Sequence, residues 1–240
     1  LSLALAAIML IGMMVVSASA VSYNDLTDKD QIVNKDAVSM LVSLGIIEGK
    51  PDGSYGPTEN VDRAQMAKML SVIMNKGVDN SALYQSVNSG LTDITSNWAK
   101  GHINYCYTTG IIAGRGTGTF DPSATVTALE AAKMLLVAVG YDPAIEGFEG
   151  ADWAINVSVR ADEQGIFEGF TKDLSAPLNR DDAALLIYNA LDVEMIQSYT
   201  TNNYPIVYSD HRTILSDKYG VIKVEGVVTA NEWAILDDDT

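Results

Sequence analysis

The sequence is poor in the residues that build disulfide frameworks, zinc sites and nucleic-acid interfaces. Among 240 residues there are one cysteine and two histidines, and 15 lysines and arginines stand against 31 acidic residues. The single cysteine, Cys106, excludes an internal disulfide and a cysteine-ligated zinc site, and its apolar neighbours predict a buried side chain. The formal net charge of -16 repels nucleic acid and anionic lipid, so we expect no nucleic-acid partner.

A recognisable catalytic constellation is also missing. The two histidines, His102 and His211, belong to no Ser/His/Asp or Cys/His set, and there is no glycine-rich phosphate loop. We interpret His102 as a surface or edge residue of a helix and the acidic run at 237–239 as a solvated face. The sequence therefore predicts no enzyme in this chain, no catalytic or metal-ligating residue and no cofactor, and it leaves any catalysis to a region beyond Thr240.

The one long apolar run lies in residues 1–20. Leu1–Val16 is almost entirely apolar and is followed by the small residues Ser17–Ala20. This pattern predicts a secretory signal peptide cleaved after Ala20, although the basic start of such a signal is missing and we expect a truncated N-terminus. A membrane anchor is the alternative, and the run of roughly 16 residues is shorter than the ~20 that span a bilayer. We expect no membrane span once the signal is removed.

Three segments of the chain repeat one pattern. A Gly-Ile-Ile or Gly-Ile-Phe motif begins at Gly45, Gly110 and Gly165. Trp98 and Trp153 precede the second and third glycines by the same number of residues. Before each glycine we predict a helix, which the glycine ends because it accepts the left-handed conformation of a Schellman stop. The apolar face predicted for the first of these helices comprises Val33, Ala37, Met40, Leu41 and Leu44.

A second helix is predicted after each glycine turn. Its N-cap residues are Asp62, Thr127 and Asn179, and Gln65 and Glu130 complete capping boxes in the first two copies. Such a helix–loop–helix unit is too small to bury its own apolar faces, so the three units should pack together.

These motifs resemble the S-layer homology domain. The opening aromatic-x-Asp of that family is matched by Tyr23–Leu26 and Leu91–Ile94, and a Gly-Ile-x-x-Gly turn, an Asp-Gly-x-Phe-x-Pro loop and a Thr-Arg-Ala-Glu-like helix start follow. The resemblance covers Tyr23 to Val193. It implies a mainly α fold in which three helix–loop–helix repeats form a pseudo-threefold bundle with grooves between neighbouring repeats.

The resemblance also implies a function. Proteins of this family are exported to the bacterial cell surface, where they bind secondary cell-wall polysaccharide, often with pyruvylated sugars, and the arginine of the Thr-Arg-Ala-Glu motif is a principal ligand. That position is held by Arg63 and Arg180, each in the first turn of a helix, where the helix dipole and a guanidinium fork both favour a carboxylate. The alternative for each is a surface arginine paired with a neighbouring acid.

Several departures limit these expectations. The second repeat has Ala128 in place of the arginine, the first has no tryptophan, and the third lacks the Asp-Gly-x-Phe-x-Pro loop, so we expect at most two well-formed grooves. Trp98 and Trp153 would stack on a sugar ring or anchor a helix in the core. Asp25 and Asp93 would accept sugar hydroxyls or cap a turn.

The chain after Val193 follows a different pattern. Ser198–Asn203 is polar and linker-like, and Val221–Thr229 alternates as a half-buried strand that turns into Trp233–Leu236. We interpret this part as the start of a truncated β-rich domain. The predicted organisation is a signal peptide at 1–20, repeats at 21–76, 91–141 and 142–196, a linker at 77–90, and the linker and partial β-rich segment at 197–240.

A second class of function stays open at this point. A calcium-dependent adhesion or scaffold module is one alternative, because the loop at 50–53 faintly resembles a calcium loop, although it lacks the alternating oxygen ligands of an EF-hand. A degenerate structural spacer that binds no polymer is another. The sequence does not fix the oligomeric state.

Overall fold

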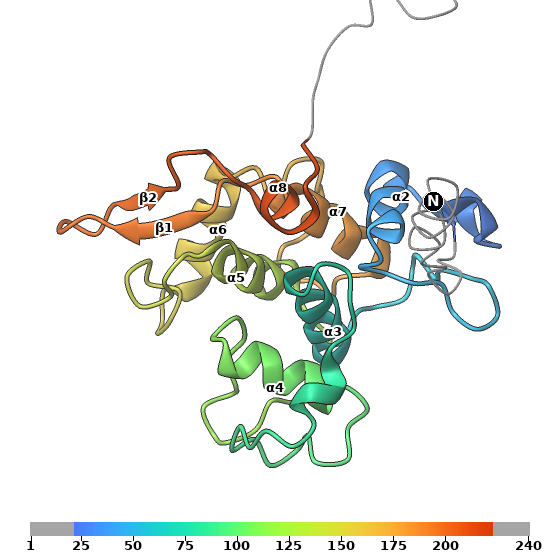
Figure 1. Cartoon of the computed structure of the whole chain (residues 1–240), viewed down its shortest axis with the longest axis horizontal. Coiled ribbons are helices and arrows are strands. Elements are labelled where there is room, and N and C mark those ends of the chain that lie inside the picture. Colours follow the sequence, from blue (N-terminus) through green and yellow to red (C-terminus); the bar gives the residue numbers. More distant parts are fainter. Residues whose placement is uncertain (1–21, 223–240) are drawn as a thin grey trace, which may run out of the picture.

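The structure is a computed structural model that describes residues 22–222. The predicted signal peptide and the predicted strand at Trp233–Leu236 lie outside the described residues. Within them the fold is mainly α with a small two-stranded sheet near the C-terminal end, as predicted (Figure 1). In chain order the elements are η1 Tyr23–Asp25, η2 Lys29–Gln31, α2 Lys35–Ser43, α3 Arg63–Met74, η3 Ser81–Tyr84, α4 Lys100–Thr108, α5 Ala128–Val139, α6 Trp153–Glu163, α7 Arg180–Ala190, β1 Ile196–Tyr199, β2 Pro205–Val207 and α8 Ile214–Tyr219.

The predicted caps set the boundaries of the second helices. Asp62 and Thr127 form capping boxes at the starts of α3 and α5. The Asn179 side chain accepts a hydrogen bond from the backbone N–H of Asp182 at the start of α7. Each cap satisfies backbone donors that the first helical turn leaves unpaired, and the three helices therefore begin at equivalent places.

The predicted glycine stops are present at the ends of α2, α4 and α6. Gly45, Gly110 and Gly165 all have positive φ, from 69° to 80°. The isoleucine after each glycine donates its N–H across the turn to a carbonyl of the preceding helix, at 2.9 Å in all three cases. This is the hydrogen bond of a Schellman stop.

The helices of different repeats interlock. Helix α4 packs against α3, α6 packs against α5, and α2 packs against α7, which is far away in the chain. Figure 1 shows the last of these pairs, with α2 beside α7. Each glycine-stopped helix is therefore buried by the capped helix of the preceding repeat, and the first repeat completes the cycle by covering the last.

A ring of three backbone hydrogen bonds joins the repeats at their centre. The N–H of Val61 donates to the carbonyl of Leu178, Leu178 donates to Val126, and Val126 donates to Val61, at 2.8–2.9 Å. All three side chains are buried. The cyclic pattern places the starts of α3, α5 and α7 around one pseudo-threefold point.

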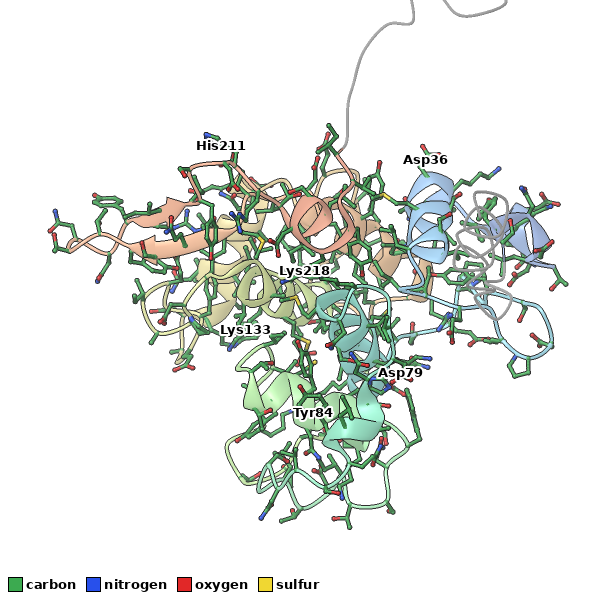
Figure 2. All side chains as sticks on the ribbon, in the orientation of Figure 1. Asp36, Asp79, Tyr84, Lys133, His211 and Lys218 are labelled. Carbon is green, nitrogen blue, oxygen red and sulfur yellow. The ribbon has the colours of Figure 1, made fainter. Side chains whose placement is uncertain are left out.

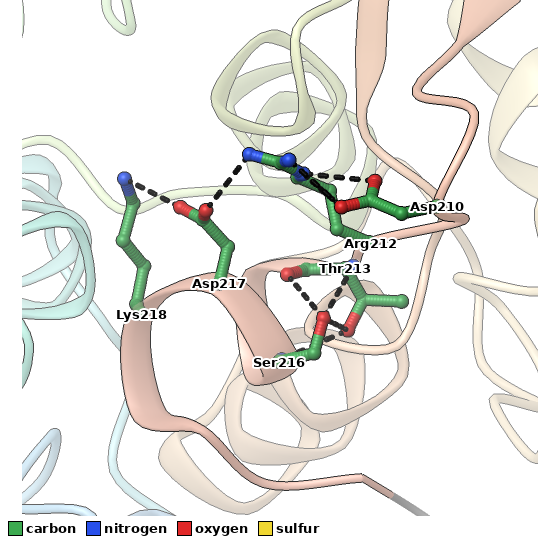
Figure 3. A network of polar contacts seen from close by, with 6 residues as sticks. All are labelled: Asp210, Arg212, Thr213, Ser216, Asp217 and Lys218. Carbon is green, nitrogen blue, oxygen red and sulfur yellow. Dashed lines mark hydrogen bonds and ion pairs between the residues drawn. The ribbon is translucent and has the colours of Figure 1, made fainter.

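The segment after α7 differs in part from the prediction. Residues 198–203 were expected to be a linker, but they form the end of β1 and the turn to β2, which pairs with β1 in antiparallel fashion. Helix α8 follows, and Figure 3 shows Arg212 bridging Asp210 and Asp217 at its start. Val221 and Ile222 are not in a strand, and the rest of that predicted strand lies outside the described residues.

Two single-residue predictions are wrong. Val33 was placed on the apolar face of the first helix, but it precedes α2 and is 82% exposed. The Asp181 carboxylate accepts the N–H groups of Val33 and Asn34, which fixes this segment before the helix begins. His102 was placed at the surface and is instead buried, because α4 packs this side chain against α3. Cys106 is buried, as predicted.

No helix within residues 22–222 is both long and apolar enough to cross a membrane.

Candidate ligand-binding grooves

Two grooves of the same construction lie between the repeats. The first, here called the Arg63 groove, has a volume of about 480 Å³, and the second, the Arg180 groove, about 260 Å³. The Arg63 groove is lined by residues that include Arg63, Ile111, Ile112, Ala113, Gly114, Arg115, Glu130, Lys133, Met134 and Trp153. The Arg180 groove is lined in the same order by Arg180, Ile46, Ile47, Glu48, Gly49, Lys50, Gln65, Lys68, Met69 and Trp98.

Arg63 lies at the floor of its groove and is held by the second repeat. Its Nε donates to the carbonyl of Phe120 at 2.8 Å, and its Nη2 donates to the carbonyl of Ala113 at 2.9 Å. The guanidinium carbon lies 4.4 Å from the centre of the Phe120 ring, within the range of a cation–π contact. These contacts fix the plane of the guanidinium.

Arg180 is held in the same way by the first repeat. Its Nε donates to the carbonyl of Tyr55 at 2.8 Å, its Nη2 donates to the carbonyl of Glu48 at 3.3 Å, and its guanidinium lies 4.7 Å from the Tyr55 ring centre. In return the Tyr55 hydroxyl donates to the carbonyl of Arg180 at 2.7 Å. The same three kinds of contact thus orient both arginines.

Neither arginine is neutralised by an acid. Within residues 22–222, neither Arg63 nor Arg180 forms an ion pair, and the Nη1 nitrogen of each makes no hydrogen bond. Burial, together with the nearby charge of Arg115, lowers the pKa of Arg63 to about 10, so it still carries its charge at neutral pH. The alternative of an arginine paired with a neighbouring acid is therefore absent from the described structure, and each Nη1 can donate to a bound anion.

Further cations line the Arg63 groove. Arg115 pairs with Glu130 at 2.9 Å. Lys133, labelled in Figure 2, donates to the carbonyl of Phe148 at 2.5 Å, and its Nζ lies 5.7 Å from the centre of the Trp153 ring. Three positive side chains and one aromatic face therefore converge on one groove.

The Arg180 groove repeats this composition. Lys68 pairs with Glu48 at 3.2 Å, and Lys50 pairs with Glu59. Sequence reasoning missed Lys68 and Lys133 as groove residues, although both stand at the sixth position after a helix N-cap. That shared position was the available signal.

The structure brings each candidate arginine to a tryptophan from another repeat. Trp153 lines the Arg63 groove, and Trp98, which is 58% exposed, lines the Arg180 groove. Each groove is thus built from three repeats, which supply the arginine, the turn with its capped helix, and the tryptophan.

The two candidate aspartates lie outside the linings of both grooves. Asp25 closes the capping box of η1 by accepting the N–H of Ser22. Asp93 accepts the N–H groups of Phe120 and Asp121, at 2.9 and 2.7 Å.

The aligned register of the first repeat was three residues off. Asp28, rather than Asp25, makes the contacts that correspond to those of Asp93, because it accepts the N–H groups of Tyr55 and Gly56 at 2.7 and 2.8 Å. In each of the first two repeats, the aspartate of the opening motif therefore binds the backbone of the loop that follows the glycine turn. The aromatic residue of that loop, Tyr55 or Phe120, packs against the groove arginine. The observed contacts of each aspartate are with the protein backbone.

The third junction lacks all three groove side chains. Ala128, Leu185 and Val33 occupy the positions that correspond to the arginine, the lysine and the tryptophan of the other two grooves. Across this junction the Asp181 carboxylate, buried in α7, binds the backbone and side-chain amides of Asn34. The cavity here is lined in part by Val33, Leu185 and Tyr188 and has no arginine at its edge.

Comparison with known proteins agrees with this architecture. Residues 22–67 and 90–132 match the family model described as the S-layer homology domain. A "Cell surface protein" of Thermoanaerobacter kivui is 30% identical over 228 residues, which is 93% of this chain and 27% of that protein. An "S-layer protein" of Bacillus licheniformis is 33% identical over 113 residues, 47% of this chain and 12% of that protein.

An enzyme is also among the relatives. "Exoglucanase XynX" of Acetivibrio thermocellus is 28% identical over 188 residues, 72% of this chain and 16% of that protein. The chain spans about a quarter or less of the length of these three relatives. The two S-layer homology matches and the surface-protein relatives indicate a cell-surface anchoring module of an exported, cell-wall-associated protein.

Proposed function

We propose that the chain anchors an exported protein non-covalently to the cell wall by binding secondary cell-wall polysaccharide in the Arg63 and Arg180 grooves. The observation that carries this proposal is the pair of oriented guanidinium groups, Arg63 and Arg180, that have no acid partner within residues 22–222. Arg63 is buried and Arg180 is half-buried. A charge that is largely buried without an ionic partner destabilises a fold, which favours an external anion as that partner. The formal net charge of the chain is -16, so these two grooves are positively charged sites on a chain that is otherwise acidic.

The chemistry of each groove favours an acidic sugar. The free Nη1 would bind a carboxylate such as that of a pyruvate ketal, the lysine would add a second charge, and the tryptophan would stack on the apolar face of a sugar ring. Because the third junction lacks all three side chains, we infer two binding sites per chain. We also infer that residues 142–196 are a third repeat of the same family and that residues 1–20 direct secretion.

The test uses purified secondary wall polysaccharide that carries pyruvate ketals, and the same material after mild acid has removed them. The double variant Arg63→Ala, Arg180→Ala should weaken binding at each groove by about 10- to 150-fold, since a charge-assisted bond is worth about 1.5–3 kcal/mol. Arg212→Ala is the matched control, because it removes an exposed arginine that pairs with Asp210, outside both grooves.

Calorimetry, with circular dichroism to confirm folding, gives the readout. Undiminished binding by the folded double variant would contradict the proposal. Equal binding of both polysaccharides would contradict the assignment of the ketal carboxylate as the anion.

A further inference from the structure

The two grooves differ beneath their tryptophans. Four residues after Trp98 stands His102, and the two rings meet edge to face, with centroids 6.4 Å apart and planes at 65°. His102 is 4% exposed, so it lies behind the tryptophan that lines the Arg180 groove. Four residues after Trp153, in the Arg63 groove, stands the buried Val157. A titratable ring therefore backs one groove tryptophan, and an aliphatic side chain backs the other.

The imidazole of His102 lies between two acceptors. Its Nδ1 is 2.6 Å from Ser71 Oγ, and its Nε2 is 3.6 Å from an oxygen of Asp79, which Figure 2 labels near the foot of α3. When the ring is protonated, Nδ1 donates to Ser71 Oγ, and the Ser71 hydroxyl can then donate to the carbonyl of Lys68, 3.0 Å away.

The neutral ring has a hydrogen on only one of its two nitrogens, so His102 can donate to Ser71 or to Asp79 but not to both. Protonation would give both nitrogens a hydrogen to donate, and the imidazolium would match both acceptors. The charged groups that face the ring are Asp79, which favours the proton, and Lys68 of α3, which opposes it. Burial is the largest influence and holds the pKa of His102 below the usual 6.5.

We propose that His102 is a positioning residue that makes the Arg180 groove sensitive to pH, while the Arg63 groove is not. In the protonated state His102 donates to both Ser71 and Asp79, which fixes the imidazole against the Trp98 ring and adds a positive charge behind the wall of the Arg180 groove. An anion bound in the groove favours this proton, and by reciprocity the proton favours the anion. The inference rests on the proposed polysaccharide binding and adds its regulation.

Single-groove variants allow the two sites to be compared on one scaffold. Arg63→Ala leaves the Arg180 groove to be measured, and Arg180→Ala leaves the Arg63 groove. With pyruvylated wall polysaccharide as the probe, the affinity of the Arg180 groove should rise about fivefold between pH 7.5 and pH 5.5, at the lower end of typical coupling between sites. The affinity of the Arg63 groove should stay constant, because carboxylates remain ionised over this range.

Replacing His102 by the residue at the corresponding position of the next repeat tests its role directly. His102→Val in the Arg63→Ala background should abolish the pH dependence. The same pH dependence in both grooves, or one that persists in His102→Val, would overturn the inference.

A measurement without polysaccharide separates this inference from the proposed function. In a pH titration followed by nuclear magnetic resonance, the indole N–H signal of Trp98 should move together with the His102 ring signals, and that of Trp153 should not. A Trp98 signal that ignores His102 would overturn the inference, whatever the polymer does. Titration of Trp98 together with a failure of polysaccharide to bind at any pH would support the coupling and contradict the proposed function.

Discussion

The Arg63 and Arg180 grooves and the third junction share one backbone plan and differ in the side chains placed on it. The same backbone hydrogen bond is found at all three junctions, in the ring formed by Val61, Val126 and Leu178. The arginine, lysine and tryptophan are present at two junctions and absent together from the third. Side chains that come from three different repeats are thus either all present or all absent at a junction, which is expected if they act together on one ligand.

The comparison also separates what the scaffold needs from what the grooves need. The glycine stops and N-caps occur in all three repeats. Every repeat needs them to define where its helices begin and end, whether or not a groove lies beside it. The groove arginines are not needed for that purpose, since α5 begins normally at Ala128. The following predictions test this separation, beginning with the largest expected effect.

Removing the loop tie of the second repeat should cost the most. Asp93→Ala leaves the N–H groups of Phe120 and Asp121 without their acceptor, and Phe120 is fully buried, so the free energy of unfolding should fall by about 1–3 kcal/mol. Chemical denaturation measures this loss. Asp25→Ala, which removes a cap of an exposed 3₁₀ turn, is the control and should change stability by about 0.5 kcal/mol or less.

Acid should reproduce part of this effect. Partial burial alone would raise the pKa of Asp93, but the N–H groups of Phe120 and Asp121 outweigh it, and the net pKa lies below 3.8. The stabilisation is therefore complete above pH 3.8 and is lost as the pH falls through the lower folded-state pKa. If Asp93→Ala loses stability below about pH 3.8 as steeply as the parent chain does, Asp93 is not the group responsible.

The tryptophans should have an intermediate effect, confined to binding. Trp98→Ala and Trp153→Ala should each weaken polysaccharide binding in their own groove by about two- to tenfold, the range of a single aromatic contact. Val33→Ala at the corresponding position of the third junction should change nothing, because Val33 is exposed and lies in neither groove. A loss of affinity in Val33→Ala would mean that the third junction takes part in binding.

Rebuilding the third junction should have the smallest effect and is the sharpest test of the comparison. The triple variant Val33→Trp, Ala128→Arg, Leu185→Lys places the groove side chains on the unused backbone positions. Titration calorimetry should show three sites per chain in place of two, with little change in affinity per site. A stoichiometry that stays at two would show that the Asp181–Asn34 contact, and not the missing side chains, closes this junction.

Much of the fold could be predicted because its signals are local. Gly110 ends α4 through its own backbone preference, and Thr127 begins α5 through a hydrogen bond to a residue three positions away. The wrong predictions, in contrast, depended on distant partners. Val33 is held outside its helix by Asp181, 148 residues away, and His102 is buried by a helix of another repeat.

The sequence predicted several residues that line the grooves, but it did not predict which of them share a groove. Arg63, Arg180, Trp98 and Trp153 all line grooves, yet the pairing of each arginine with its tryptophan required the structure. The first-repeat aspartate was misplaced by three residues, because Asp25 and Asp28 each stand two residues after an aromatic or apolar residue. The spacing to the glycine stop, 17 residues for both Asp28 and Asp93, was the available signal. Lys68 and Lys133 were not predicted as groove residues, although each stands six residues after the N-cap of its helix.

The sequence by itself determined where helices start and stop, that the unit repeats, and that two first-turn arginines occupy equivalent positions. These features depend on backbone hydrogen bonds and side chains within a few residues of one another. Only the tertiary structure decided that Arg180 is clamped by Tyr55, 125 residues away, that Trp98 completes its groove, and that His102 lies behind that tryptophan. Such contacts arise when distant helices pack together, and short-range spacing in the sequence carries no record of that packing.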